Sequence, residues 1–241
     1  SEKITKENIY RSVYVNSGFN DAKTRKLLSD IYKEAEKFIV IMNTLSHKEI
    51  YDKTLLEEFD KRKLDSMFNS KYEEYNAYLD KSEKTYSYFL EKYQTEWKNV
   101  MFYLERGMQH KIALNIYKRS EYLIFLFLSD LFITLNDIES NKQKFNIGSS
   151  INLAEAFISC LNDKKLFEFI EHNNIENKDL LYLHYLGYLA LRNLDSEEHY
   201  NNLKKYALSN FDHLHESLQK ATIVYLINYC TRKLKRNNSY K

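Results

Sequence analysis

Seven histidines are the side chains of this sequence best suited to bind a metal or to transfer a proton. They are His47, His110, His172, His184, His199, His213 and His215. A di-iron site in a helical bundle needs a glutamate three residues before a histidine, and neither His172 nor His199 has one. His215 is followed by a glutamate, but the second histidine of an H-E-x-x-H zinc motif is absent. His213 and His215 could share a metal, although side chains two residues apart diverge once a helix begins. The sequence therefore predicts no metal site, and we expect the histidines at helix ends or facing solvent.

Nucleophiles and phosphate-binding loops are equally weak candidates. The Gly148-Ser149-Ser150 corner is not the G-x-S-x-G elbow of a serine hydrolase. Neither G-x-x-x-x-G-K-[ST] nor G-x-G-x-x-G occurs in the sequence. Cys160 lies among apolar residues, which favours a small core residue over a reactive thiolate. Cys230 stands close to Arg232 and Lys233, cations that could activate its thiol, but packing is again the favoured interpretation.

Acidic residues also occur in pairs, but each pair is adjacent in the sequence. The pairs are Glu57/Glu58, Glu73/Glu74 and Glu197/Glu198. Neighbours on a helix point about 100° apart, which suits solvated faces better than an acid and a base acting on one substrate. The sequence therefore predicts no catalytic residue and no cofactor, and we do not expect an enzyme.

The scarcity of glycine and proline indicates the elements that position these residues. The 241 residues include 4 glycines and 0 prolines, whereas average usage would give about 17 and about 12. These two residue types make most tight turns and hairpins. Their scarcity argues against sandwiches, barrels and Gly-rich nucleotide-binding folds, and it favours an all-α protein of long helices joined by short polar links.

Charge and hydropathy limit the partners and the location. Lys and Arg number 36 against 34 Asp and Glu, a balance that argues against a nucleic-acid-binding protein. The longest apolar run, Tyr122 to Leu135, is interrupted by Asp130 and is shorter than the ~20 residues of a membrane span. The two cysteines form no C-x-x-C motif, which favours the reducing cytoplasm over an oxidising compartment.

Apolar residues recur with helical spacing along the chain. The first stripe comprises Leu27, Leu28, Ile31, Tyr32, Ala35, Phe38, Ile39, Met42 and Leu45. Further helices are predicted over residues 50–59, 64–79, 86–104, 151–161, 164–170, 180–194, 197–208 and 214–234. Ser46 and Glu49 have the spacing of a capping box between the first two helices, and Gly107 is predicted to end the helix over 86–104.

The middle of the chain predicts how these helices are organised. Residues 122–128 are apolar on every side, which predicts a helix buried among its neighbours. Residues 136–150 are polar and are predicted to form a linker. We expect an N-terminal helical bundle over residues 1–140 and a helical-repeat part over 141–241, packed as one continuous unit. Successive short helix pairs favour antiparallel packing in an α-solenoid resembling tetratricopeptide repeats.

Two clusters are candidates for binding a partner. Tyr182, Tyr185 and Tyr188 could line a concave groove, as solenoids present to peptides, or they could pack between layers with their hydroxyls at the rim. Arg232, Lys235 and Arg236 would form a cationic stripe for phosphate or an acidic partner. Alternatively, they are the cations that the dipole favours at the end of a helix.

Three stretches carry a similarity to known sequences. They are residues 20–30 (NDAKTRKLLSD), residues 196–200 (SEEHY) followed by Leu203 and Lys204, and residues 228–233 (NYCTRK). They resemble segments of a family of long, uncharacterised helical-repeat proteins of Bacteroidetes, in which isoleucine stands at the place of Thr231. The resemblance implies tetratricopeptide-like helical repeats and no assigned activity. Members of that family continue with further helix pairs, which implies that this chain corresponds to an N-terminal portion.

These patterns together predict a non-enzymatic scaffold or protein–protein interaction module with an unidentified protein or peptide partner. The alternative is a regulatory protein that contacts nucleic acid or an acidic partner through the basic C-terminal helix. The balanced charge makes nucleic acid the weaker of these two partners.

Overall fold

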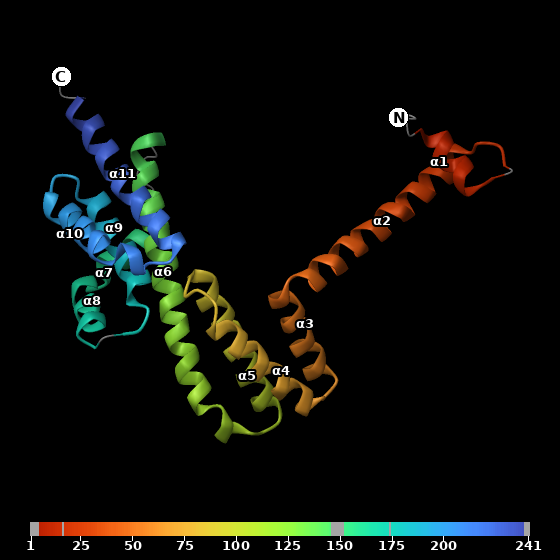
Figure 1. Cartoon of the computed structure of the whole chain (residues 1–241), viewed down its shortest axis with the longest axis horizontal. Helices are drawn as coiled ribbons and strands as arrows, with labels where there is room; N and C mark the ends of the chain where they lie inside the picture. The colour runs from red at the N-terminus through yellow and green to blue at the C-terminus, as the bar shows by residue number, and fades with distance from the viewer. Residues whose placement is uncertain (1–4, 16, 146–151, 174, 239–241) are drawn as a thin grey trace. The chain divides into compact units, whose positions relative to one another are not determined.

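The computed structural model describes residues 5–15, 17–145, 152–173 and 175–238, with the backbone alone for residues 143–145 and 235–238. Within these ranges the chain forms α-helices and two short 3-10 helices, and it forms no strand (Figure 1). The all-α prediction is confirmed. The chain divides into an N-terminal unit, Ser1–Glu73, and a C-terminal unit, Glu74–Lys241. Residues 140 and 141, where the sequence places a domain boundary, both lie within one helix of the C-terminal unit.

The N-terminal unit is built on one long helix. It contains α1 (Lys6–Val13), α2 (Asp21–Ser46), α3 (Lys48–Lys61) and the first part of α4 (Asp65–Asp80). The side chain of Asn20 caps α2 by accepting a 3.0 Å hydrogen bond from the backbone N–H of Lys23. Tyr10 of α1 is buried, and its ring lies 5.7 Å from that of Phe19 just before α2. This aromatic contact therefore lies beside the beginning of α2.

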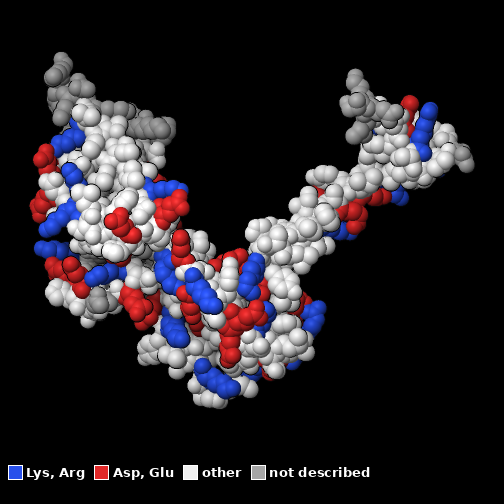
Figure 2. Space-filling model, in the orientation of Figure 1, with Lys and Arg blue, Asp and Glu red and all other residues white. Residues whose placement is uncertain are grey.

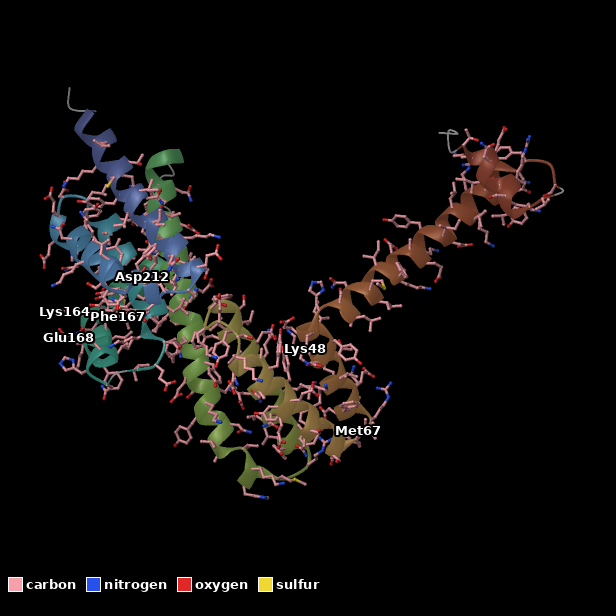
Figure 3. All side chains as sticks on the ribbon, viewed as in Figure 1. Lys48, Met67, Lys164, Phe167, Glu168 and Asp212 are labelled. Atoms are coloured by element: carbon pink, nitrogen blue, oxygen red, sulfur yellow. The ribbon has the colours of Figure 1, made fainter. Side chains whose placement is uncertain are left out.

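A buried carboxylate joins α3 to α4. Asp52 is 1% exposed, and its two oxygens lie 2.8 Å from Lys48 Nζ and 3.4 Å from Lys71 Nζ. Figure 3 labels Lys48 at the start of α3. A buried charge is tolerated when it is paired, and two ammonium groups from different helices fulfil that condition here.

The predicted capping box between α2 and α3 is wrong. Ser46 is the last residue of α2, and its hydroxyl donates to the carbonyl of Met42 at 2.8 Å. His47 stands at the cap position of α3 and makes no side-chain cap hydrogen bond. A serine hydroxyl that bonds four residues back competes with capping, so α2 continues through Ser46.

The C-terminal unit contains the remaining helices. They are α5 (Tyr86–Glu105), η1 (Gln109–Lys111), α6 (Ala113–Phe145), α7 (Leu153–Cys160), α8 (Asp163–His172), α9 (Lys178–Arg192), α10 (Glu197–Asn210), η2 (Phe211–His213) and α11 (Glu216–Asn238). Each apolar stripe that the sequence places in this unit lies on one of these helices. The helix positions are therefore confirmed, with ends that differ by a few residues.

The core of the C-terminal unit is aromatic. Helices α5 and α6 run antiparallel, and the rings of Phe89 and Phe125 stack 4.6 Å apart between them. Two turns further along α6, Phe132 lies 5.3 Å from Tyr185 of α9. Tyr185 in turn stacks on Phe167 of α8 at 3.8 Å; Phe167 is labelled in Figure 3. Buried aromatic pairs of this kind contribute about 0.5–1.5 kcal/mol each beyond their buried area.

Helix α6 differs from the prediction in two respects. It contacts α5, α7 and α9, but Leu123, Ile124 and Phe127 are exposed, so the apolar run is not buried on every side. Residues 136–145 of the predicted linker are helical, and residues 146–150, including Gly148, lie outside the described residues. The reason is visible at Asn136, whose buried amide donates to the carbonyls of Phe132 at 2.8 Å and His184 at 3.0 Å. A polar residue with such partners can continue a helix in the core.

Gly107 ends α5 as predicted. Its φ is +67°, in the left-handed region that favours glycine. Its N–H bonds to the carbonyl of Leu104 at 3.0 Å, and the N–H of Met108 bonds to that of Tyr103 at 2.9 Å. These two bonds form a Schellman motif, which satisfies carbonyls at the helix end.

We expect Gly107→Ala to lower the free energy of unfolding by about 1 kcal/mol, because alanine is strained at positive φ. The matched substitution is Lys63→Gly. Lys63 ends α3 at φ 57° with the same two hydrogen bonds, from Lys63 to Asp60 and from Leu64 to Phe59. Glycine there should raise the free energy of unfolding by up to about 1 kcal/mol. Urea denaturation followed by circular dichroism measures both changes. If both substitutions changed the free energy of unfolding in the same direction, the left-handed conformation of the two residues would be contradicted.

Candidate functional site

The main candidate for contacting a partner is the apolar stripe of α2. Helix α2 contacts α1 near its beginning and α3 at its other end. Between these contacts six stripe residues are between 48% and 66% exposed. They are Ile31, Tyr32, Phe38, Ile39, Met42 and Leu45. Soluble monomers rarely expose a contiguous apolar patch of this kind, and such patches mark interaction sites. These six residues form the apolar face of α2.

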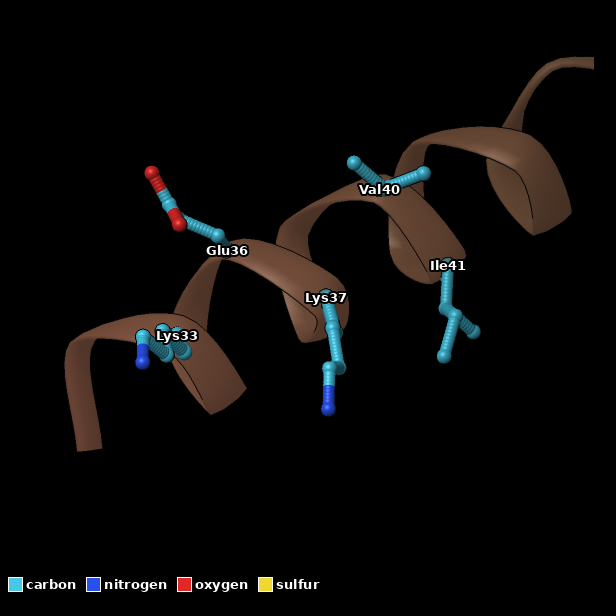
Figure 4. A pocket seen from close by; sticks show the side chains of 5 residues that line it. All are labelled: Lys33, Glu36, Lys37, Val40 and Ile41. Atoms are coloured by element: carbon cyan, nitrogen blue, oxygen red, sulfur yellow. The ribbon is translucent and has the colours of Figure 1, made fainter. Parts of the chain in front are cut away.

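The charged side chains of α2 lie away from this face. Lys37 Nζ lies 2.7 Å from the carboxylate of Glu34, and Arg25 pairs with Asp21. In Figure 2 the charged side chains of α2 gather along one edge of the helix, and the remaining surface in view is largely uncharged. Figure 4 shows Lys33, Glu36, Lys37, Val40 and Ile41, the side chains of α2 that line a pocket on the surface of this helix. A partner on the apolar face would therefore leave these charges in water.

A second candidate is a pocket of about 400 Å³ in the C-terminal unit. Its lining comes from the start of α5, from α6, from α9 and from the start of α11. The residues are Thr85, Tyr86, Ser87, Ile133, Leu180, His184, Ser217 and Leu218. His184 is the titratable imidazole among them. The sequence predicts it at a helix end or facing solvent, whereas it is buried in the middle of α9.

His184 and its partner Tyr225 are poorly suited to acid–base catalysis at neutral pH. Nδ1 of His184 lies 2.6 Å from the hydroxyl of Tyr225 on α11. Burial, with a smaller contribution from His215, lowers the pKa of His184 to about 4, and burial raises the pKa of Tyr225 above its ordinary value. Both groups are therefore neutral near pH 7, and an imidazole with so low a pKa is a poor general base. The pair links α9 to α11, and the amide of Asn136 adds α6 to the same network.

The three tyrosines that are candidates for lining a groove lie in the packing of the C-terminal unit. Tyr185 and Tyr188 are buried in the aromatic core, and the Tyr188 hydroxyl accepts a 2.6 Å hydrogen bond from Arg192. Tyr182 is partly buried, with its ring 4.7 Å from that of Tyr206 on α10. These positions agree with the packing interpretation. A partner-binding role for the three residues stays a prediction. The burial of Tyr185 and Tyr188 argues against such a role.

The basic cluster is only partly described. The Arg232 side chain is 11% exposed, with one nitrogen donating to the carbonyl of Leu191 at 3.1 Å and another 3.9 Å from Glu139. Lys233, beside it, pairs with Glu197 at 2.5 Å. The side chains of Lys235 and Arg236 lie outside the described residues. Arg232 therefore joins α11 to α9 and α6, and the cationic contact for an acidic partner stays a prediction.

The interpretation of both cysteines as packed residues is wrong. Cys160 and Cys230 are free and exposed. Cys160 is the last residue of α7, and Cys230 Sγ lies 3.6 Å from the hydroxyl of Tyr200. Over the described ranges, no group of three or more His, Cys, Asp or Glu side chains is placed to hold a metal ion. No helix in the part of the chain that the structure describes has the length and apolar character of a membrane span.

Sequence reasoning identified the residues of the α2 face as a helical stripe and placed that helix in an N-terminal bundle. The signal that distinguishes the two roles is weak, because an apolar stripe looks the same whether its cover belongs to the same chain or to another. Comparison of the chain with protein-family models, with curated proteins and with solved structures finds no match. The resemblance to a helical-repeat family therefore stays a prediction.

Proposed function

We propose that this chain is a non-enzymatic helical interaction module that binds a protein partner through the apolar face of α2. The observation that carries the proposal is the exposure of that face over its central turns. An isolated helix is marginal in water, and most helices in proteins are stabilised by packing of their apolar side. A partner that covers α2 would supply this packing.

The C-terminal unit is the scaffold in this proposal. Helices α9, α10 and α11 each contact the other two, as successive helices of a solenoid do. This order supports a tetratricopeptide-like arrangement as part of the proposal. A cytoplasmic location belongs to it as well and rests on the two free cysteines, since exposed thiols persist in a reducing compartment.

Site-specific photo-crosslinking tests the proposal directly. A photoreactive phenylalanine analogue replaces Tyr32 on the apolar face in one variant and Lys26 on the charged side of the same helix in the other. After illumination in a native lysate, we expect discrete adducts from position 32 and few from position 26. Adding Phe38→Glu to the position 32 variant should remove them, because a charge in the face cannot be desolvated cheaply. Equal labelling from both positions, or none from position 32, would refute the proposal.

A further inference from the structure

The apolar stripe of α2 has the spacing of a coiled-coil seam. Leu28, Ile31, Ala35, Phe38, Met42 and Leu45 follow one another at intervals of three, four, three, four and three residues. This 3.5-residue period keeps a row of side chains toward one straight neighbour and is typical of helices that pair with another helix. This spacing favours a helix as the covering element over an extended peptide or a small molecule.

The seam is complementary to itself when two copies run antiparallel. If the two-fold axis lies between residues 36 and 37, Ala35 of each copy faces Phe38 of the other. The same alignment sets Ile31 against Met42, and Leu28 against Leu45. Phe38 thus meets a small side chain and Ile31 meets a flexible one, which suits close packing, and two leucines meet in the outer layers. In a parallel pair every residue meets its own copy, which places two alanines in one layer and two phenylalanines in the next.

The residues beside the seam agree with this alignment. Tyr32 comes beside Ile39 of the other copy, which extends the apolar contact on one flank. On the other flank Glu34 comes beside Ile41 and keeps its ion pair with Lys37 at the rim. No two like charges face each other across the seam, so the alignment carries none of the repulsion that specifies against a pairing.

The exposed area is sufficient for such a pair. A large apolar side chain exposes roughly 100 Å² at these fractions, so the six residues offer roughly 600 Å² per copy. Two copies would bury at most about 1,200 Å² in total, which reaches the lower limit of stable interfaces. A pair of this size dissociates on dilution, which makes its formation dependent on concentration.

We propose that the apolar face of α2 binds the same face of a second copy of this chain, forming an antiparallel two-helix seam. This inference rests on the proposed function, since it names the partner for the same surface. The resulting dimer is symmetric. Each copy uses the same face, so the α2 faces are both buried and the assembly stops at two copies.

Sedimentation equilibrium of the full chain tests the dimer. We expect a mass near twice 29.1 kDa at high protein concentration and a return toward 29.1 kDa on dilution. Phe38→Glu should give a monomer at every concentration, whereas Lys33→Glu, the same new side chain on the charged side, should leave the dimer intact. Phe38 is exposed in the single chain, so circular dichroism should show unchanged helix content in both variants.

Cysteine crosslinking tests the orientation, in a background with Cys160→Ser and Cys230→Ser. Ile31→Cys alone should form no disulfide dimer, because in the antiparallel seam its own copy lies about 16 Å away along the helix. A mixture of Ile31→Cys and Met42→Cys chains should form one, since these positions face each other. Disulfide formation by Ile31→Cys alone would indicate a parallel pair and overturn the alignment.

The outcomes separate this inference from the proposed function. The proposed dimer is wrong if the wild-type chain stays monomeric at every concentration. It is also wrong if the Phe38→Glu chain still forms a dimer. If position 32 then still crosslinks to a different protein, the interaction module stands with another partner. If position 32 crosslinks only within its own chain, both proposals fail, because the face is then covered internally.

Discussion

Gly187→Ala is expected to lower the free energy of unfolding by about 2 kcal/mol, although alanine is the better helix former. Gly187 lies in the middle of α9, where that helix packs closely on α11. A Cβ atom there would stand 2.5 Å from Cδ2 and 2.9 Å from Cγ of Tyr225. The ring cannot retreat easily, because its hydroxyl is held 2.6 Å from His184 one turn earlier on α9. The cost of overpacking therefore exceeds the gain in helix propensity.

Two further variants decide whether steric contact causes this loss. Gly18→Ala is the control, since a Cβ at Gly18 meets no atom within 4 Å, and its effect should stay within about 0.5 kcal/mol. In a Tyr225→Leu background, Gly187→Ala should cost less than in the native chain, because the ring atoms that it strikes are gone. Urea denaturation of the native chain, the three single variants and the double variant gives the five free energies of unfolding. A rise of about 1 kcal/mol for Gly187→Ala alone, as in an unobstructed helix, would contradict the close packing of α9 on α11.

His184 should make the C-terminal unit lose stability as the pH falls. Its pKa is lowered from 6.5 to about 4 by burial in the folded chain. Between these two values the unfolded chain binds the proton more readily, so the free energy of unfolding decreases as the pH falls from about 6.5 to about 4. The full stability from this group is present above pH ~6.5. The loss is complete near pH 4 and amounts to about 3 kcal/mol, because the free energy of unfolding falls by about 1.4 kcal/mol for each pH unit between the two pKa values.

His184→Gln isolates this contribution, because glutamine cannot take up a proton and its amide oxygen can still accept from the Tyr225 hydroxyl. Urea denaturation of both proteins at several values between pH ~4 and ~6.5 should show a shallower decline for the variant. Part of the decline should remain, since burial also lowers the pKa of His215, the imidazole beside His184. Parallel curves for the two proteins would show that His184 is solvated in the folded chain.

The sequence predicted the helices well because the signals that define them are local. An apolar stripe with a 3.6-residue period and a residue that tolerates positive φ can be read within a few residues of the element they specify. Gly107 illustrates this, since its conformational freedom and the end of the stripe before it predict the same helix terminus. Ser46 shows the limit, because its hydroxyl could serve either neighbouring helix, and the choice of Met42 as acceptor depends on where α2 ends.

The candidate sites could not be predicted in the same way, because burial depends on residues far apart in the chain. The polar sequence around Asn136 predicts a linker, but the side-chain amide of Asn136 donates to the carbonyl of His184, 48 residues away. Arg232 looked like part of a surface stripe, but its guanidinium bonds to the carbonyl of Leu191, 41 residues earlier. No local pattern contains these partners.

The sequence by itself determined that this protein is helical, where its helices lie and that α2 carries a continuous apolar stripe. Only the tertiary structure decided which stripes are covered. The stripe of α9 is buried against α6, α8 and α11, whereas the stripe of α2 is exposed from Ile31 to Leu45. The physical reason is that a helix forms from hydrogen bonds within four residues, whereas the burial of its apolar side requires another element, whose position the helix itself does not encode.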